Sequence, residues 1–261
     1  MIIGKIHDSA VISPAAKLAS GVEVAAFAVI GPDVELGEGC IVHSHAVIHG
    51  PSRFGARNVF HPFCVIGGDP QDYTFGGEHV ELVAGDDNIF REHVTISRGT
   101  KKGGGVTRIG SENFFLSYSH VGHDCQIGNG TLFVNGATLA GHVTVHDFVT
   151  LGAFSPVHQF CRLGRYAYIG ACTVITQDVL PFSLIVTERE TRCFGANTIG
   201  LERKGFSAER IQTLQRAFKL LVRSRKNTAQ ALTEMRQKLG ESADIQEMIA
   251  FVESAARGIV K

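Results

Sequence analysis

The sequence lacks several features that mark common protein classes. It has no tryptophan among its 261 residues, and its 25 basic residues balance 25 acidic ones. This balance gives no global attraction to nucleic acids or to anionic membranes. No stretch approaches the ~20 apolar residues that a membrane-spanning helix needs, and the N-terminal MIIGKIHDSA lacks a signal-peptide pattern. We therefore expect a cytoplasmic protein with no nucleic-acid partner and no membrane span.

Cysteine is also used sparingly, and no C-x-x-C pair occurs among the six cysteines. Four of them, Cys40, Cys64, Cys125 and Cys161, occupy the same position of a sequence repeat, two residues before an apolar one. That position favours small buried side chains, and a buried free cysteine behaves as a small hydrophobe. We therefore expect reduced core thiols rather than disulfides or a zinc site.

Glycine, by contrast, is abundant at 30 residues, and an apolar residue, the step residue, recurs at every sixth position. One run extends from Ile6 to Ile66 and a second from Ile109 to Ile175. Six is the hexapeptide period of a parallel β-helix, in which three hexapeptides form one 18-residue triangular coil. The repeat predicts a left-handed parallel β-helix with inward step residues. The glycine that often follows a step residue is expected to turn the corner with positive φ.

Two interruptions of the repeat predict loops near residues 68–83 and 97–108. In the first, two step positions fall on Asp72 and Glu78; in the second, seven extra residues separate Ile96 from Ile109. Loops held by a rigid scaffold often carry function. The expected domains are the β-helix over 1–180, a connection over 181–206 and a small helical domain over 207–261. Its helices are expected to begin at Ser207, at Thr228, and at Ser242 or Asp244.

The eighteen-residue coil predicts which polar side chains share a column. It places His123 under Gly141 and Gln159, and Asp124 under His142, with His120 and His158 nearby. A histidine beside an aspartate can act as a general base, and the Gly141 N–H can approach a reacting carbonyl.

Zinc bound by His120, His123 and His142 is the alternative, because some left-handed β-helix proteins hydrate carbon dioxide in this way. The long first loop and the basic, glycine-rich second loop instead indicate a large anionic substrate.

At these residues the sequence resembles the UDP-N-acetylglucosamine acyltransferase family of lipid A biosynthesis. The resemblance extends from the first hexapeptide to the terminal helices. Its most specific strings are PQDYTFGGE (70–78), ISRGTKKGGGVTRIG (96–110), HVGHDCQIGN (120–129), LAGHVTV (139–145), VHQFCRLG (157–164) and NTIGLERKGFS (197–207).

The resemblance implies transfer of a 3-hydroxyacyl chain from acyl carrier protein to the 3-hydroxyl of UDP-N-acetylglucosamine, the first step of lipid A biosynthesis. It implies a homotrimer with a cleft between neighbouring prisms, and no cofactor, metal or acyl-enzyme. His123 would be the general base, Asp124 its support, and the Gly141 N–H the oxyanion donor. The implied substrate contacts are Gln71, Asp72, His120, His142, His158, Gln159, Asn197 and Arg203.

The chain departs from the family pattern at a few positions. Ala171 stands where long-chain members commonly have glycine, and its methyl group is expected to shorten the preferred acyl chain. Ser97 replaces a common histidine, Thr74 a common lysine, and residues 187–190 (TERE) a Gly-Asn pair. These departures leave open a 3-amino sugar acceptor, which would give N-acylation.

Overall fold

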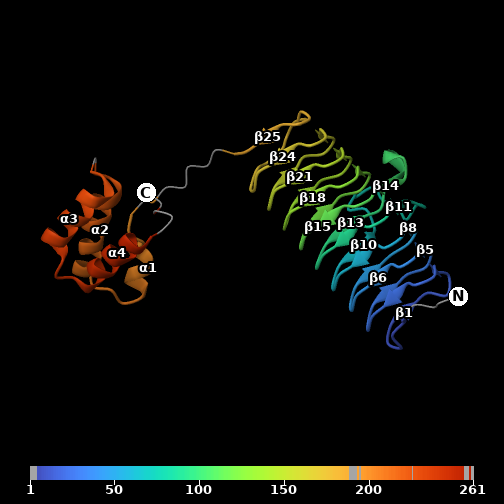
Figure 1. The fold of residues 1–261 in the computed structure, drawn as a ribbon, viewed down its shortest axis with the longest axis horizontal. Coiled ribbons are helices and arrows are strands. Elements are labelled where there is room, and N and C mark those ends of the chain that lie inside the picture. The colour runs from blue at the N-terminus through green and yellow to red at the C-terminus, as the bar shows by residue number, and fades with distance from the viewer. Residues whose placement is uncertain (1–4, 188–192, 194, 225, 256–258, 260–261) are drawn as a thin grey trace. The chain divides into compact units, whose positions relative to one another are not determined.

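The computed structural model describes residues 5–187, 193, 195–224, 226–255 and 259. The chain divides into two compact units, Met1–Thr187 and Glu188–Lys261. Each unit is described by itself, and Figure 1 labels the elements of both.

Within the described residues, the first unit is the expected left-handed parallel β-helix, here called the prism, with three parallel sheets. Sheet 1 contains β1 (Val11–Ile12), β4 (Val29–Ile30), β7 (Val47–Ile48), β10 (Val65–Gly68), β13 (Thr95–Ser97), β16 (His120–Val121), β19 (Thr138–Leu139) and β22 (Pro156–Val157). Sheet 2 contains β2 (Lys17–Leu18), β5 (Val34–Leu36), β8 (Ser52–Phe54), β11 (Glu81–Ala84), β14 (Val106–Ile109), β17 (Gln126–Ile127), β20 (Thr144–Val145) and β23 (Arg162–Leu163). Sheet 3 contains β3 (Glu23–Val24), β6 (Ile41–Val42), β9 (Val59–Phe60), β12 (Ile89–Phe90), β15 (Phe114–Phe115), β18 (Leu132–Phe133), β21 (Thr150–Leu151), β24 (Tyr168–Ile169) and β25 (Leu184–Ile185).

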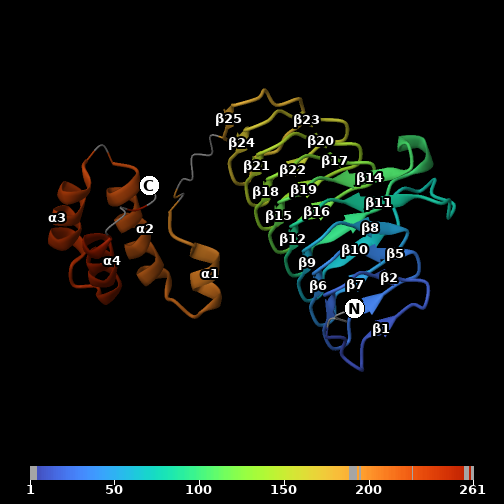
Figure 2. The same cartoon turned by 45° about the vertical axis from the view of Figure 1, so that its right-hand side comes forward.

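The chain visits sheets 1, 2 and 3 in turn, so the coils stack along one axis from β1 to β25 (Figure 2). Uninterrupted coils pair residues 18 apart: Ile12 lies beside Ile30, and Ile30 beside Ile48. The step residues fill the interior, where Phe60, Phe90 and Phe115 stack with ring centroids 5.2 and 5.3 Å apart. Burial of these rings supplies the cohesion that a single coil lacks.

The four repeat-phased cysteines lie in this core as expected, buried and unpaired: Cys40, Cys64, Cys125 and Cys161. Burial raises the pKa of the Cys64 and Cys125 thiols to about 12. These thiols therefore stay protonated at neutral pH and serve as packing groups.

The expected positive φ after the step residue is wrong for most of the corners. The positive φ instead occurs three residues after the step residue, and ordinary residues such as Phe27, His45 and Phe63 adopt it. Glycine is needed after the step residues for a different, steric reason. A Cβ on Gly152 would lie 2.5 Å from the backbone of Gly170 in the next coil. Close approach of coils, rather than backbone conformation, requires glycine there.

Both loops leave the prism at the corner between sheets 1 and 2. The first covers residues 69–80, between β10 and β11, and the second covers residues 98–105, between β13 and β14. They project side by side near β11 and β14, in teal and green (Figure 2). Both loops are shorter than expected because the strands that follow them, β11 and β14, are four residues long and pair with each other over their whole length.

The prism continues beyond the expected end at residue 180. The strand β25 pairs with β24, aligning Ile185 with Ile169, so this turn of the helix takes 16 residues instead of 18. The 181–206 connection is therefore not irregular throughout. It contains β25 and the short helix α1 (Thr198–Arg203), while residues 188–190 of the TERE departure lie outside the described residues.

The second unit contains α1 and the helices α2 (Ala208–Val222), α3 (Thr228–Leu239) and α4 (Ala243–Ser254). Ser207 caps α2 as expected. The α3 cap is Asn227 rather than Thr228, because Asn227 and Gln230 form a reciprocal capping box. Buried Leu214, Leu232 and Ile249 contribute to a separate small core. Among the helices that the structure describes, none has the length and apolar character needed to cross a bilayer.

Candidate active site

Among the described residues, a close group of three titratable side chains lies at the corner between sheets 1 and 2. His123 and Asp124 come after β16 and Gly122, and Nδ1 of His123 lies 2.8 Å from Oδ2 of Asp124. An ionised carboxylate only accepts hydrogen bonds, so this contact places the imidazole proton on Nδ1. The Nε2 atom of His123 is then left as a proton acceptor.

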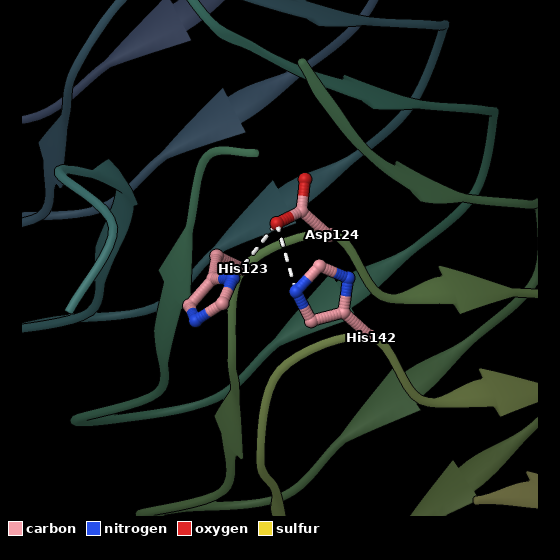
Figure 3. Close-up of side chains that lie close together, drawn as sticks. All are labelled: His123, Asp124 and His142. Atoms are coloured by element: carbon pink, nitrogen blue, oxygen red, sulfur yellow. Dashed lines mark hydrogen bonds and ion pairs between the residues drawn. The ribbon is translucent and has the colours of Figure 1, made fainter. Parts of the chain in front are cut away.

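A second imidazole approaches the same carboxylate oxygen, as Figure 3 shows. Nε2 of His142 lies 3.6 Å from Oδ2 of Asp124, and the His142 ring stacks on Phe160 with centroids 4.6 Å apart. The Asp124 side chain is 1% exposed. A buried carboxylate between two imidazoles can stabilise positive charge on either of them.

His120 does not join this cluster. Its Nδ1 is bonded to the hydroxyl of Thr95 at 2.8 Å, and burial, followed by the charge of His123, lowers its pKa. Among the described residues, the side chains that could hold a metal ion are His123, Asp124 and His142, whose ligand atoms lie within 4.8 Å of one another. His120, the third histidine of the alternative zinc set, therefore lies outside this group.

Gly141 lies directly against the ring of His123, in the column that the eighteen-residue coil predicts. A Cβ at this position would lie 2.5 Å from Cε1 and 2.7 Å from Nε2 of His123. Only glycine leaves the imidazole in its place.

The Gly141 N–H stands two residues after a step residue, a corner position whose N–H is bonded in some of the described coils and not in others. At the corner between sheets 2 and 3, equivalent N–H groups donate to side chains of the next coil, as Ser111 does to Asn129 at 2.8 Å and Asn129 to Asp147 at 2.7 Å. For Gly141 no acceptor is found in the part of the chain that the structure describes. The amide beside His123 is thus available to a ligand.

Thr100, in the second loop, holds the Asp124 carboxylate and was not anticipated. Its N–H donates to Oδ1 at 2.7 Å and its hydroxyl to Oδ2 at 2.6 Å. The 18-residue spacing could not predict this contact because Thr100 lies in the second loop, where seven extra residues interrupt the repeat. The one available signal was the excursion itself, which leaves the prism one coil before His123.

The first loop carries Gln71, which is exposed, and Asp72, which is half-buried. Hydrogen bonds from the N–H and hydroxyl of Thr74 lower the pKa of Asp72, and the charges of Lys102 and His123 add to this effect. Lys102 Nζ donates to the Thr74 hydroxyl at 2.9 Å, which joins the two loops. The structure thus brings Asp72 within electrostatic range of His123.

The remaining expected site residues belong partly to the prism and partly to the second unit. His158 and Gln159 are exposed at the same corner, and Ala171 lies at a different corner, between sheets 3 and 1. Asn197 caps α1 in the second unit, and the exposed Arg203 is the last residue of that helix.

Comparisons with known proteins agree with these features. Residues 178–260 match the family described as UDP N-acetylglucosamine O-acyltransferase, domain 2, and residues 5–50 match bacterial transferase hexapeptide repeats. The protein named acyl-[acyl-carrier-protein]--UDP-N-acetylglucosamine O-acyltransferase in Alkalilimnicola ehrlichii is 52% identical over 257 residues, covering 98% of this chain and 99% of that one. This chain belongs to the UDP-N-acetylglucosamine O-acyltransferase family.

Other members of the family are similar over nearly their whole length. The Stenotrophomonas maltophilia (strain K279a) protein of the same name is 48% identical, with 98% of each chain covered. The solved structure of the UDP-N-acetylglucosamine acyltransferase of Francisella novicida is 35% identical, with a TM-score of 0.69 and 98% and 94% coverage. That of Campylobacter jejuni is 32% identical, with a TM-score of 0.68 and 98% and 100% coverage. The resemblance drawn from the sequence strings is confirmed, and the chain is an acyltransferase.

Proposed function

We propose that this chain transfers a 3-hydroxyacyl group from acyl carrier protein to the 3-hydroxyl of UDP-N-acetylglucosamine in lipid A biosynthesis, with His123 as general base and no covalent intermediate. The names of its relatives give acyl carrier protein and UDP-N-acetylglucosamine, and the 3-hydroxyl groups of the acyl chain and of the acceptor are part of the proposal. The observation that carries the mechanism is the His123 ring, held by Asp124 at Nδ1 and facing Gly141 at Nε2.

The proposed reaction begins when Nε2 of His123 removes the proton from the sugar hydroxyl. The oxygen attacks the thioester carbonyl, and the Gly141 N–H donates to the oxyanion that forms. Asp124 stabilises the imidazolium. As the tetrahedral intermediate collapses, the carbon–sulfur bond breaks and His123 returns its proton to the departing thiolate.

The chemistry of the corner supports direct transfer. The nucleophile nearest in sequence, Cys125, is buried, its sulfur contacts the carbonyl of Ala140 at 3.2 Å, and burial raises its pKa to about 12. Such a thiol is a poor candidate for an acyl-enzyme. A metal held by His123, Asp124 and His142 would compete with the contact between His123 and Asp124 that the proposed base needs.

A trimer is part of the proposal. At the corner between sheets 3 and 1, rings form an exposed stack with centroids 4.7–5.4 Å apart, through Phe27, His45, Phe63, His93 and Tyr118. Phe27, Phe63 and Tyr118 are each more than half exposed. Exposed apolar surface of this kind is typical of a subunit interface. Clefts between neighbouring prisms would take the substrates, with Gln71, Asp72, His158 and Gln159 along them and Asn197 and Arg203 at the nucleotide.

The direct test is His123→Ala in the full chain. We expect acyl transfer to fall by at least about 10³-fold, as for loss of a general base, while the circular dichroism spectrum and the oligomeric mass stay unchanged. Activity is measured with 3-hydroxyacyl carrier protein and with acceptors carrying either a 3-hydroxyl or a 3-amino group. Full activity of the variant would refute the proposed mechanism. Preference for the amino acceptor would replace O-acylation by N-acylation, and activity that requires stoichiometric zinc would favour metal chemistry.

A further inference from the structure

The second loop closes over the Asp124 carboxylate through one short 3₁₀ helix, η1 (Lys101–Gly103). Thr100 caps this helix and is 5% exposed. Its hydroxyl accepts from the Gly103 N–H at 3.1 Å and donates to Asp124, so one side chain both caps the start of η1 and holds the carboxylate.

Gly103 allows this closure. A Cβ at Gly103 would overlap the carboxyl group of Asp124, so a larger residue would lift η1 away from the carboxylate. The Asp124 N–H donates to the hydroxyl of Thr107 at 2.8 Å, and this hydrogen bond holds the backbone of Asp124. Asp124 is thus enclosed by the second loop and by β14.

The enclosed carboxylate has two possible imidazole partners. Oδ2 lies 2.8 Å from Nδ1 of His123 and 3.6 Å from Nε2 of His142. Both imidazoles approach the same oxygen, so rotation about the Cβ–Cγ bond of Asp124 would move Oδ2 out of its hydrogen bond with His123. The two hydrogen bonds from Thr100 engage both carboxylate oxygens and oppose that rotation.

We propose that Thr100 is a positioning residue of the acyl transfer, which fixes the Asp124 carboxylate on Nδ1 of His123 and so keeps Nε2 free to take the proton. This inference rests on the proposed function. Thr100 acts through Asp124 and touches no substrate, so its loss lowers kcat and leaves the KM of the sugar nucleotide nearly unchanged.

The experiment compares Thr100→Val with Thr100→Ser in the full chain. Valine keeps the shape and the N–H but removes the hydroxyl, while serine restores it. Since a hydrogen bond to a charged group contributes about 1.5–3 kcal/mol, we expect kcat to fall roughly tenfold to a hundredfold in the valine variant. The serine variant is expected to recover kcat to within about threefold, and both KM values to stay within about twofold, because the binding groups are untouched. If the valine variant does not fold, Thr100→Ala takes its place in the comparison with Thr100→Ser.

Thr131→Val is the matched control. Thr131 is also buried, and its hydroxyl donates to Oδ1 of Asn113 at 2.7 Å in the core, away from Asp124. This variant is expected to lower the unfolding temperature as Thr100→Val does, with kcat unchanged. Wild-type kcat in Thr100→Val, no recovery in Thr100→Ser, or an equal loss in Thr131→Val would each overturn the inference.

His123→Ala, measured in parallel, separates this inference from the proposed function. An active His123→Ala enzyme refutes the general base itself. An inactive His123→Ala enzyme beside a fully active Thr100→Val enzyme refutes only the role of Thr100.

Discussion

Gly141 is the residue at which the geometry of the site leaves least room. Its Cα faces the His123 ring, and a Cβ would lie 2.5 Å from Cε1. Gly141→Ala must therefore turn the imidazole away from Asp124 or push the coils apart. Because a misplacement of about 1 Å at a catalytic group can cost roughly 10²-fold in rate, we expect kcat/KM to fall by at least about a hundredfold.

Steady-state kinetics of acyl transfer by Gly141→Ala check this expectation. Gly68→Ala is the control, since a Cβ there meets no atom within 4 Å and its backbone is unstrained. We expect that variant to keep wild-type kinetics. An unimpaired Gly141→Ala enzyme would show that the His123 ring is not held where the structure places it.

At the residue scale, the sequence predicted contacts that follow from the coil and missed those that do not. His123 meets Gly141, and Asp124 meets His142, because 18 residues separate the members of each pair and no insertion lies between them. Thr100 could not be placed in the same way. Its position depends on the path of an inserted loop, which side-chain hydrogen bonds set and periodicity does not.

At the element scale, a column of buried amides joins successive coils at the corner between sheets 2 and 3. Oδ1 of Asn58 accepts from the side chain of Asn88 at 2.9 Å, and Oδ1 of Asn88 accepts from the N–H and side chain of Asn113 at 3.0 and 2.9 Å. Each amide satisfies backbone groups that the turn leaves unpaired, which buried polar groups require. The column joins the two coils from which the loops depart.

Asn88→Ala should therefore destabilise the prism more than loss of one surface side chain does. It removes the acceptor of the Asn113 N–H and of one Nδ2 hydrogen of Asn113, while Nδ2 keeps its bond to the Gly128 carbonyl. At about 1–3 kcal/mol for each unpaired group, we expect a loss of about 2–6 kcal/mol in unfolding free energy. Urea unfolding at fixed protein concentration measures it. The control is Asn135→Ala, which removes an exposed asparagine and should cost at most about 0.5 kcal/mol. Equal losses in the two variants would contradict a supporting role for the column.

The elements themselves were predictable where the repeat is regular. The period gave the strands and their inward faces, since each step residue must be buried against the next coil. It could not give the end of the prism, because the last turn drops two residues and still pairs β25 with β24. Nor could it give the positive φ of Phe27 or Phe63, which the coil geometry imposes on whatever residue stands there.

At the scale of the whole molecule, one prism does not bring His123 and Ala171 together. His123 lies at the corner between sheets 1 and 2, while Ala171 lies between sheets 3 and 1, at the corner that carries the exposed ring stack. In a closed three-fold ring, each interface joins two different patches of neighbouring subunits, and the proposal assigns these two corners to that interface. The proposed cleft would then take its base from one subunit and its limit on acyl length from the next.

Mixed trimers test this arrangement. His123→Ala alone lacks the base, and Ala171→Trp alone is expected to block the acyl channel, so each homotrimer should be inactive with the preferred acyl chain. Co-expressed in equal amounts, they form trimers in which roughly a quarter of the clefts combine an intact His123 with an intact Ala171 from the neighbour. We expect activity to return to about that fraction of wild type. Mixing His123→Ala with His123→Gln is the control and should restore none. If the first mixture also stays inactive while mass measurement shows mixed trimers, the base and Ala171 serve the same cleft from one chain. An active Ala171→Trp homotrimer would instead show that Ala171 lies outside the cleft.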